Sequence, residues 1–199
     1  MSGDAHKTDA QQNSNASLVA QSGEHLGQRI SHIYQVECYG PDGLLKWSDS
    51  FHNLVTTAGL NKYLDATLKT GVTSPLWYVG LVTGPAATSN PGSPGNPNVY
   101  ALADTIGIHG GWAENVTYSN LARPQWNPGS IAAGSVDNSA SKAIFNINGT
   151  ATIAGCFMAD NSTKSGSIGT LLGVGNFTGG DRLVQSGDTL NVTVTATQS

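Results

Sequence analysis

Charged side chains are scarce in this chain of 199 residues. Lysine, arginine, aspartate and glutamate together make up 11% of the residues, against roughly 25% in an ordinary soluble domain. The nine lysines and arginines are scattered along the chain, and the formal net charge is −4. Proteins that bind nucleic acid or an anionic membrane surface concentrate basic side chains against phosphates. The sequence therefore predicts neither kind of partner.

Long apolar runs and cysteines are also lacking. No stretch approaches the roughly 20 apolar residues of a membrane-spanning helix, and residues 1–17 contain no apolar core of a secretory signal. We therefore expect the protein to be made in a reducing cytoplasm. The two cysteines, Cys38 and Cys156, each lie in an apolar run. Buried free thiols are the favoured interpretation, and one disulfide bridge is the alternative.

Glycine is abundant, with 25 residues, and Asn, Ser and Thr are frequent. This composition is typical of a fold with many turns whose outer faces carry hydroxyls and amides. Such faces are common on proteins that pack against other proteins. A domain of this size buries roughly 70% of the surface that its unfolded chain exposes, so its core needs no disulfide or metal.

The first 28 residues differ from the rest of the chain. Residues 1–28 show no hydrophobic period, and such a segment cannot bury enough apolar area to offset its ordering entropy. We predict an N-terminal arm that is flexible or becomes ordered on a partner, followed by a β-domain over residues 29–199. The candidate partner-contact residues are Leu18, Val19, Leu26 and Arg29.

Alternating apolar residues predict strands in the β-domain. The first two form a predicted β-hairpin, with Tyr34, Val36 and Cys38 on one side of a Gly40–Gly43 turn and Leu45, Trp47 and Phe51 on the other. Further strands are predicted at residues 76–82, 116–122, 142–147, 150–158, 167–175 and 188–195. Asn148-Gly149 is a strong hairpin signal between two of them. Residues 84–98 carry four prolines and predict a long loop.

One segment changes to a helical period. Leu60, Leu64 and Leu68 repeat every four residues, with Thr56 or Thr57 as the N-cap and Gly71 just beyond the end. We expect this leucine stripe to lie across the open end or a face of a sheet. The fold predicted from all these segments is all-β: a two-sheet sandwich or jelly roll with one short helix and an extended N-terminal arm.

The sequence offers no convincing catalytic or metal-binding set. Ser165–Gly169 matches a nucleophile elbow only superficially, because a strand and not a helix follows it. Asp104 with His109, and Asp49 with His52, are lone pairs of potential metal ligands, and we interpret them as loop and turn residues. No two carboxylates stand out as a glycosidase pair. We predict no enzyme activity and no catalytic, metal or cofactor residue.

The four tryptophans allow two interpretations. Trp47, Trp77, Trp112 and Trp126 could form sugar-stacking platforms beside Asn, Gln and Asp residues. The favoured interpretation is that they fill the core or a subunit interface, because large aromatic side chains gain most from burial.

Several segments resemble small structural proteins of tailed bacteriophages. They are Tyr34–Cys38 with Asp42-Gly43 and Lys46-Trp47, then Asn53–Asn61, Trp77–Leu81, Trp112–Glu114 with Tyr118, Ala151–Phe157 and Gly187–Leu190. The resemblance covers residues 30–197 and leaves the arm outside. These are fold motifs without catalytic chemistry.

The resemblance implies a component of the virion. Within that class we favour a capsid cement or decoration protein on the capsid surface, made in the host bacterial cytoplasm, whose partners are the major capsid protein and further copies of itself. A tail or fibre module that recognises host-surface carbohydrate is the alternative. A decoration protein must hold capsomer junctions together, and an extended arm suits that task because it gains contact area without a large globular footprint.

Overall fold

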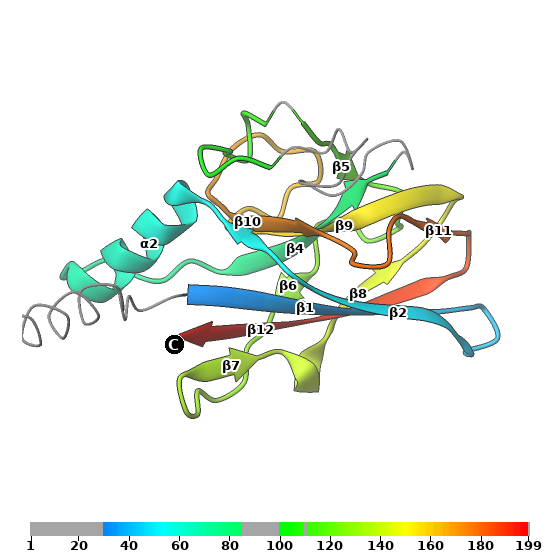
Figure 1. The fold of residues 1–199 in the computed structure, drawn as a ribbon, viewed down its shortest axis with the longest axis horizontal. Helices are drawn as coiled ribbons and strands as arrows, with labels where there is room; N and C mark the ends of the chain where they lie inside the picture. The colour runs from blue at the N-terminus through cyan, green and yellow to red at the C-terminus, as the bar shows by residue number, and fades with distance from the viewer. Residues whose placement is uncertain (1–29, 85–99, 110, 199) are drawn as a thin grey trace, which may run out of the picture.

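The computed structural model describes residues 30–84, 100–109 and 111–198. The predicted arm and nearly all of the predicted proline-rich loop lie outside these residues. In the described part, two antiparallel sheets face one another and a single α-helix extends from one end (Figure 1). The predicted all-β sandwich with one short helix is confirmed.

The first sheet is built around the two longest strands. β1 (Ile30–Tyr39) lies between β2 (Leu45–His52) and β12 (Thr189–Gln198). Two short strands, β7 (Ser135–Asp137) and β8 (Ala143–Asn146), both pair with β12. The predicted hairpin of β1 and β2 is confirmed, and β1 also pairs with β12 from Ile30 opposite Gln198 to Tyr39 opposite Thr189.

The second sheet has longer central strands and short flanking ones. Its order is β3 (Leu54–Val55), β10 (Leu171–Asn176), β9 (Ala151–Ala159), β4 (Trp77–Thr83) and β5 (Glu114–Asn115). β6 (Gln125–Trp126) also pairs with β4, and β11 (Arg182–Val184) pairs with β9.

The main core lies between the sheets. Strand alternation directs Tyr34, Val36 and Cys38 of β1 inward, where they meet Leu81 and Met158 from the second sheet in one buried cluster. A second cluster, which includes Phe157 and Trp112, covers the other face of the second sheet. Because this sheet is covered on both faces, its central strands are apolar nearly throughout, as predicted for residues 76–82.

Gly80 permits this close packing in the middle of β4. A Cβ atom at this position would overlap the aromatic ring of Phe157 on the neighbouring strand. Glycine is therefore required here by the close approach of a side chain and not by backbone conformation.

The hairpin predicted at Asn148-Gly149 is not formed, because β8 and β9 belong to different sheets and the chain crosses between them. Ile147 extends the pairing of β8 with β12: its backbone N–H donates to Asp188 and its backbone oxygen accepts from Gly187, just before β12 begins. Neither Asn148 nor Gly149 has the positive φ that a two-residue hairpin turn requires.

The predicted strand over residues 116–122 is also wrong. The strand in this region, β5, ends at Asn115, whose side-chain oxygen accepts a hydrogen bond from the backbone of Thr117 and turns the chain. After this turn Tyr118 forms an isolated bridge with Ile147.

The α-helix forms where predicted but presents its leucines differently. α2 (Thr57–Leu68) is capped by the Thr56 hydroxyl, which accepts a hydrogen bond from the backbone of Gly59. Gly59 is the buried residue of α2 and packs against the backbone of Leu172, where a Cβ atom would overlap. The helix therefore docks along its Gly59 side, and the prediction that the leucine stripe covers the sheets was wrong.

Candidate functional site

A groove of about 330 Å³ opens at the end of the sandwich from which α2 extends. Both sheets and the helix contribute to it: Trp77 and Trp126 come from the second sheet, Val136 and Ala196 from the first, and Tyr63 from α2. Tyr63, Val136 and Ala196 also pack against the main core. The groove is therefore the point where the apolar interior reaches the surface.

Tyr63 is fixed in the groove wall by β1. Its hydroxyl lies 2.9 Å from Nε2 of His32, and its ring is tilted against the ring of Trp77 with centroids 6.5 Å apart. Nδ2 of Asn53 lies 3.3 Å from the other ring nitrogen of His32. Burial lowers the pKa of His32 to about 4 and raises the pKa of Tyr63 to about 12, so both side chains are neutral at pH 7.

Trp126 is fixed from the opposite sheet. Its indole Nε1 donates a hydrogen bond to the backbone oxygen of Val194 at 2.9 Å. Its position opposite Trp77 in the pairing of β4 and β6 places two tryptophans on one side of the groove. Tyr63 and Trp126 therefore line the groove with aromatic rings whose polar atoms are bonded within the fold.

Large apolar side chains are exposed on α2, on the segment between α2 and β4, and before β7. They are Leu60 (38%), Leu64 (54%) and Leu68 (77%) on α2, and Val72 (37%), Leu76 (59%) and Ile131 (78%) on the connecting segments. Leu76 and Ile131 line the groove, and Leu60 lies three residues from Tyr63, one turn along the helix. We call these six residues and the groove together the apolar end surface.

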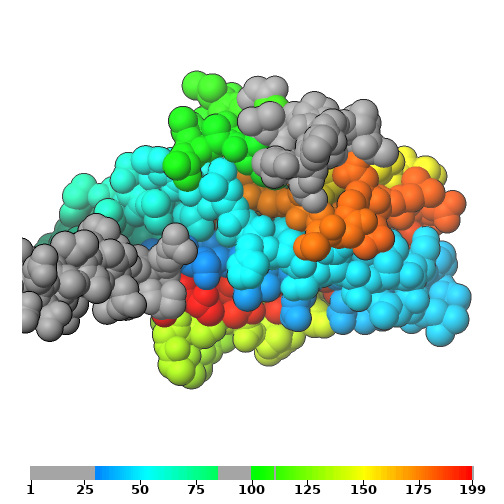
Figure 2. All heavy atoms as spheres, in the orientation of Figure 1, coloured from blue at the N-terminus to red at the C-terminus, as the bar shows by residue number. Residues whose placement is uncertain are grey.

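The apolar end surface combines an apolar groove with exposed leucines on a nearby helix. On α2, the charge of Asp65 is balanced by an ion pair with Lys69, which follows the helix. Exposed apolar side chains beside an apolar groove favour contact with another apolar surface, because exposing them to water is unfavourable. Figure 2 shows that α2 lies at one end of the molecule and the turn between β1 and β2 at the other. The surface is thus confined to one end.

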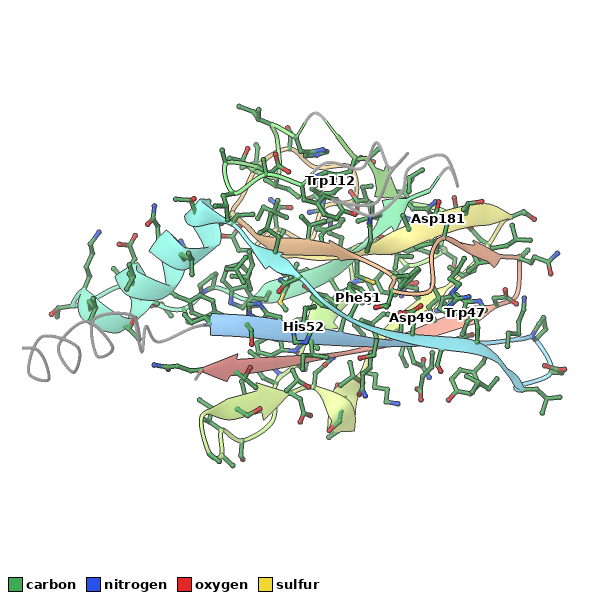
Figure 3. All side chains as sticks on the ribbon, viewed as in Figure 1. Trp47, Asp49, Phe51, His52, Trp112 and Asp181 are labelled. Atoms are coloured by element: carbon green, nitrogen blue, oxygen red, sulfur yellow. The ribbon has the colours of Figure 1, made fainter. Side chains whose placement is uncertain are left out.

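The tryptophans confirm the core-filling interpretation. Trp77, Trp112 and Trp126 are each less than one tenth exposed, and Trp47 is partly buried beside the main core. Trp112 lies far from Trp47 across the second sheet (Figure 3). Among the residues that the structure describes, no tryptophan is presented as a platform for a sugar.

The two pairs that could have been metal ligands are held by other contacts. Asp104 accepts hydrogen bonds from the backbone of Ala101 and the indole of Trp112, and His109 stacks on Trp112 with ring centroids 3.9 Å apart. Asp49 is bonded to Arg182 and lies apart from His52 along β2 (Figure 3). No group of three potential metal ligands occurs within the described ranges.

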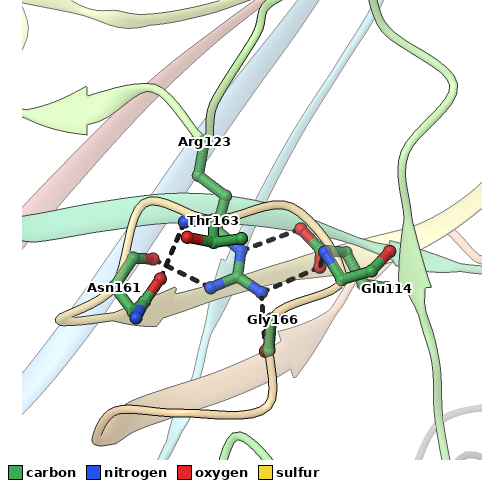
Figure 4. Close-up of polar contacts among 6 residues, drawn as sticks. Glu114, Arg123, Asn161, Thr163 and Gly166 are labelled. Carbon is green, nitrogen blue, oxygen red and sulfur yellow. Dashed lines mark hydrogen bonds and ion pairs between the residues drawn. The ribbon is translucent and has the colours of Figure 1, made fainter.

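A buried ion pair lies near the elbow-like segment Ser165–Gly169. Arg123 donates to both carboxylate oxygens of Glu114 at 2.8 Å and also to the backbone oxygens of Asn161 and Gly166 (Figure 4). The backbone of Ser165 donates to the same carboxylate. Each charge is therefore balanced and hydrogen-bonded, and the pair fastens a loop to the second sheet.

The cysteines are both buried and free, so the favoured interpretation is confirmed. Burial, with a smaller contribution from Asp188, raises the pKa of Cys38 to about 11. Burial also raises the pKa of Cys156 well above its ordinary value. Both side chains are protonated thiols at pH 7 and are poor nucleophiles.

The four candidate contact residues Leu18, Val19, Leu26 and Arg29 lie outside the described residues. The apolar end surface was not predicted as a contact site. Its leucine stripe was visible in the sequence, but the period does not tell whether the core or another molecule covers it. Leu76 was predicted to begin the strand over residues 76–82, and Ile131 gave no periodic signal.

No helix in the described part of the chain is long and apolar enough to cross a membrane.

Comparison with known proteins assigns this chain to no family. No protein-family model matches the sequence, and no curated protein matches it either.

Proposed function

We propose that this chain is a non-enzymatic structural protein of a tailed-bacteriophage virion. Specifically, it acts as a capsid cement or decoration protein that bridges capsid subunits and stabilises the icosahedral head. The observation that carries the proposal is the apolar end surface, with Leu64 and Leu68 more than half exposed on a helix that extends from the sandwich.

The chemistry of the surface supports a protein partner. Leucine, isoleucine and aromatic side chains on fixed elements form the kind of desolvated centre that dominates binding energy in protein interfaces. Tyr63 ties α2 to β1 through His32, so the exposed leucines stand on a fixed helix. Less conformational entropy is therefore lost when a partner covers them.

The rest of the molecule supports a structural role. The buried ion pair of Arg123 and Glu114 is fully used within the fold, and both thiols are protonated. The segments that resemble small phage structural proteins include strands of both sheets and the start of α2. A charge-poor surface is suited to lie against neighbouring capsid subunits.

Self-association fits the same role. Copies of this chain bind one another as well as the major capsid protein. Because the copies are linked, each weak contact forms at a high effective concentration. The N-terminal arm, through Leu18, Val19 and Arg29, adds contact beyond the globular domain. The capsid surface is the proposed location.

The test uses phage heads assembled without this protein. The full-length protein should co-sediment with such heads, and the variant Leu64→Asp/Leu68→Asp should lose at least ten-fold in occupancy. A matched control is Leu121→Asp/Ile168→Asp, which places the same charges on residues 99% and 77% exposed outside the apolar end surface. The control should bind like the unchanged protein.

Two results would overturn the proposal. One is the absence of any binding of the unchanged protein to heads under conditions where its fold is intact. The other is electron-microscopic density for the protein on the tail alone, which would favour the tail or fibre module. Equal loss of occupancy by the two variants would overturn the role of the apolar end surface.

A further inference from the structure

The described chain begins at the rim of the groove. Ile30 pairs with Gln198, and His32 pairs with Ala196, which lines the groove. Two residues of an antiparallel strand span about 7 Å, so Ile30 lies about that far along the strand from Ala196. The first described residue of β1 therefore lies close to the part of the first sheet that lines the groove.

The groove needs an apolar occupant. Its aromatic and aliphatic lining includes Leu76 and Ile131, exposed by 59% and 78%. Apart from Ser74 and Gln125 the lining is apolar or aromatic, and Trp126 is bonded to Val194 and Tyr63 to His32. A charged or strongly polar ligand would find few partners here, whereas an aliphatic side chain fits the lining.

Residues 1–29 supply few such side chains. The large aliphatic residues of that segment are Leu18, Val19 and Leu26. Leu26 precedes Ile30 by four residues, a length of chain that reaches about 13 Å when extended. Leu18 and Val19 precede Ile30 by twelve and eleven residues. Leu26 is therefore the aliphatic side chain whose tether matches the position of the groove.

We infer that the chain's own N-terminal segment folds back at Ile30 and that the side chain of Leu26 occupies the groove between Ile131 and the two tryptophans. Leu26 then closes the open end of the core. With Leu26 in the groove, Leu18 and Val19 are the aliphatic residues of the segment that stay available for contact with another molecule. Leu26 occupies the groove whichever partner binds the leucines of α2.

A disulfide trap in the full-length protein tests this placement. The variant Leu26→Cys/Ile131→Cys is oxidised with oxidised glutathione, and the bridge is followed by non-reducing gel and peptide mass. The native thiols are buried and do not compete. The control is Leu26→Cys/Leu44→Cys, because Leu44 is 68% exposed in the turn at the opposite end of the molecule. We expect an intramolecular bridge at least ten-fold faster in the first variant, at a rate independent of protein concentration.

The remaining outcomes contradict the inference. Equal rates in the two variants would mean that Leu26 is not held at the groove. A disulfide-linked dimer formed as fast from a mixture of the single variants Leu26→Cys and Ile131→Cys would assign the groove to the segment of a second copy. A second measurement, hydrogen exchange of residues 124–131, should show faster exchange in Leu26→Asp than in Leu18→Asp. Equal exchange in these two would also overturn the placement.

Discussion

The imidazole of His32 and the hydroxyl of Tyr63 lie 2.9 Å apart, and this contact ties β1 to α2. The two rings are also stacked, with an interplanar angle of 17°. Since His32 is 1% exposed, the joint between the sandwich and the helix that carries the apolar end surface contains a buried titratable group.

This joint predicts a loss of stability in mild acid. Burial lowers the pKa of His32 from 6.5 to about 4, so between these values the unfolded chain binds a proton that the folded chain does not. The contribution of neutral His32 is complete above pH 6.5 and is lost as the pH falls toward 4. From pH 7.5 to pH 5 the free energy of unfolding should fall by about 2 kcal/mol more in the natural protein than in His32→Gln. Urea denaturation at the two pH values measures this, and identical pH dependence of the two proteins would refute the prediction.

The buried ion pair predicts strong destabilisation when one partner is removed. Arg123→Met leaves the carboxylate of Glu114, whose side chain is 8% exposed, without its guanidinium. The free energy of unfolding should fall by about 3–5 kcal/mol, as measured by urea denaturation. Lys69→Met breaks the exposed ion pair with Asp65 and should cost less than about 1 kcal/mol. Similar losses in the two variants would contradict the conclusion that the buried pair holds a loop to the second sheet.

Gly80 predicts a steric penalty. Gly80→Ala forces a methyl group against the ring of Phe157 in a tightly packed part of the second sheet, and overpacking of this kind costs about 1–3 kcal/mol. Gly129→Ala is the control, because the nearest atom to its added Cβ would lie 3.6 Å away, at an ordinary contact distance. Thermal unfolding should show a lower Tm for Gly80→Ala alone.

The buried thiols predict slow labelling. Because Cys38 and Cys156 are buried and their pKa values are raised by burial, an aromatic disulfide reagent at pH 8 should modify neither in the folded protein. Both should react at once in denaturant. Rapid labelling of one thiol without denaturant would show that its part of the core opens readily.

The fold was predictable wherever a local period decides the structure. In β12, Leu190, Val192 and Val194 alternate with polar residues and are the inward-facing side chains. The hairpin predicted at Asn148-Gly149 was wrong because a turn signal describes only a local preference. Ile147 is still bonded to Gly187 and Asp188 beside the first sheet, and the chain then crosses to β9 in the second sheet.

The candidate site was only partly predictable for a related reason. The spacing of Leu60, Leu64 and Leu68 showed that one side of α2 is apolar, but a period cannot tell what covers that side. Docking was decided by Gly59, whose lack of a side chain lets the helix approach Leu172 closely. Ile131 joins the groove through the tertiary path of the chain, and no local pattern marks it.

The pairing of β1 with β12 also governs the order in which the molecule can assemble. While the chain is being synthesised, β1 can pair early with its neighbour β2, but its other edge has no partner until residues 189–198 have left the ribosome. Contacts so distant in sequence form slowly, and an open strand edge invites association with other chains in the meantime. Correct folding should therefore depend on low concentrations of nascent chain or on chaperones more than on the stability of the finished sandwich.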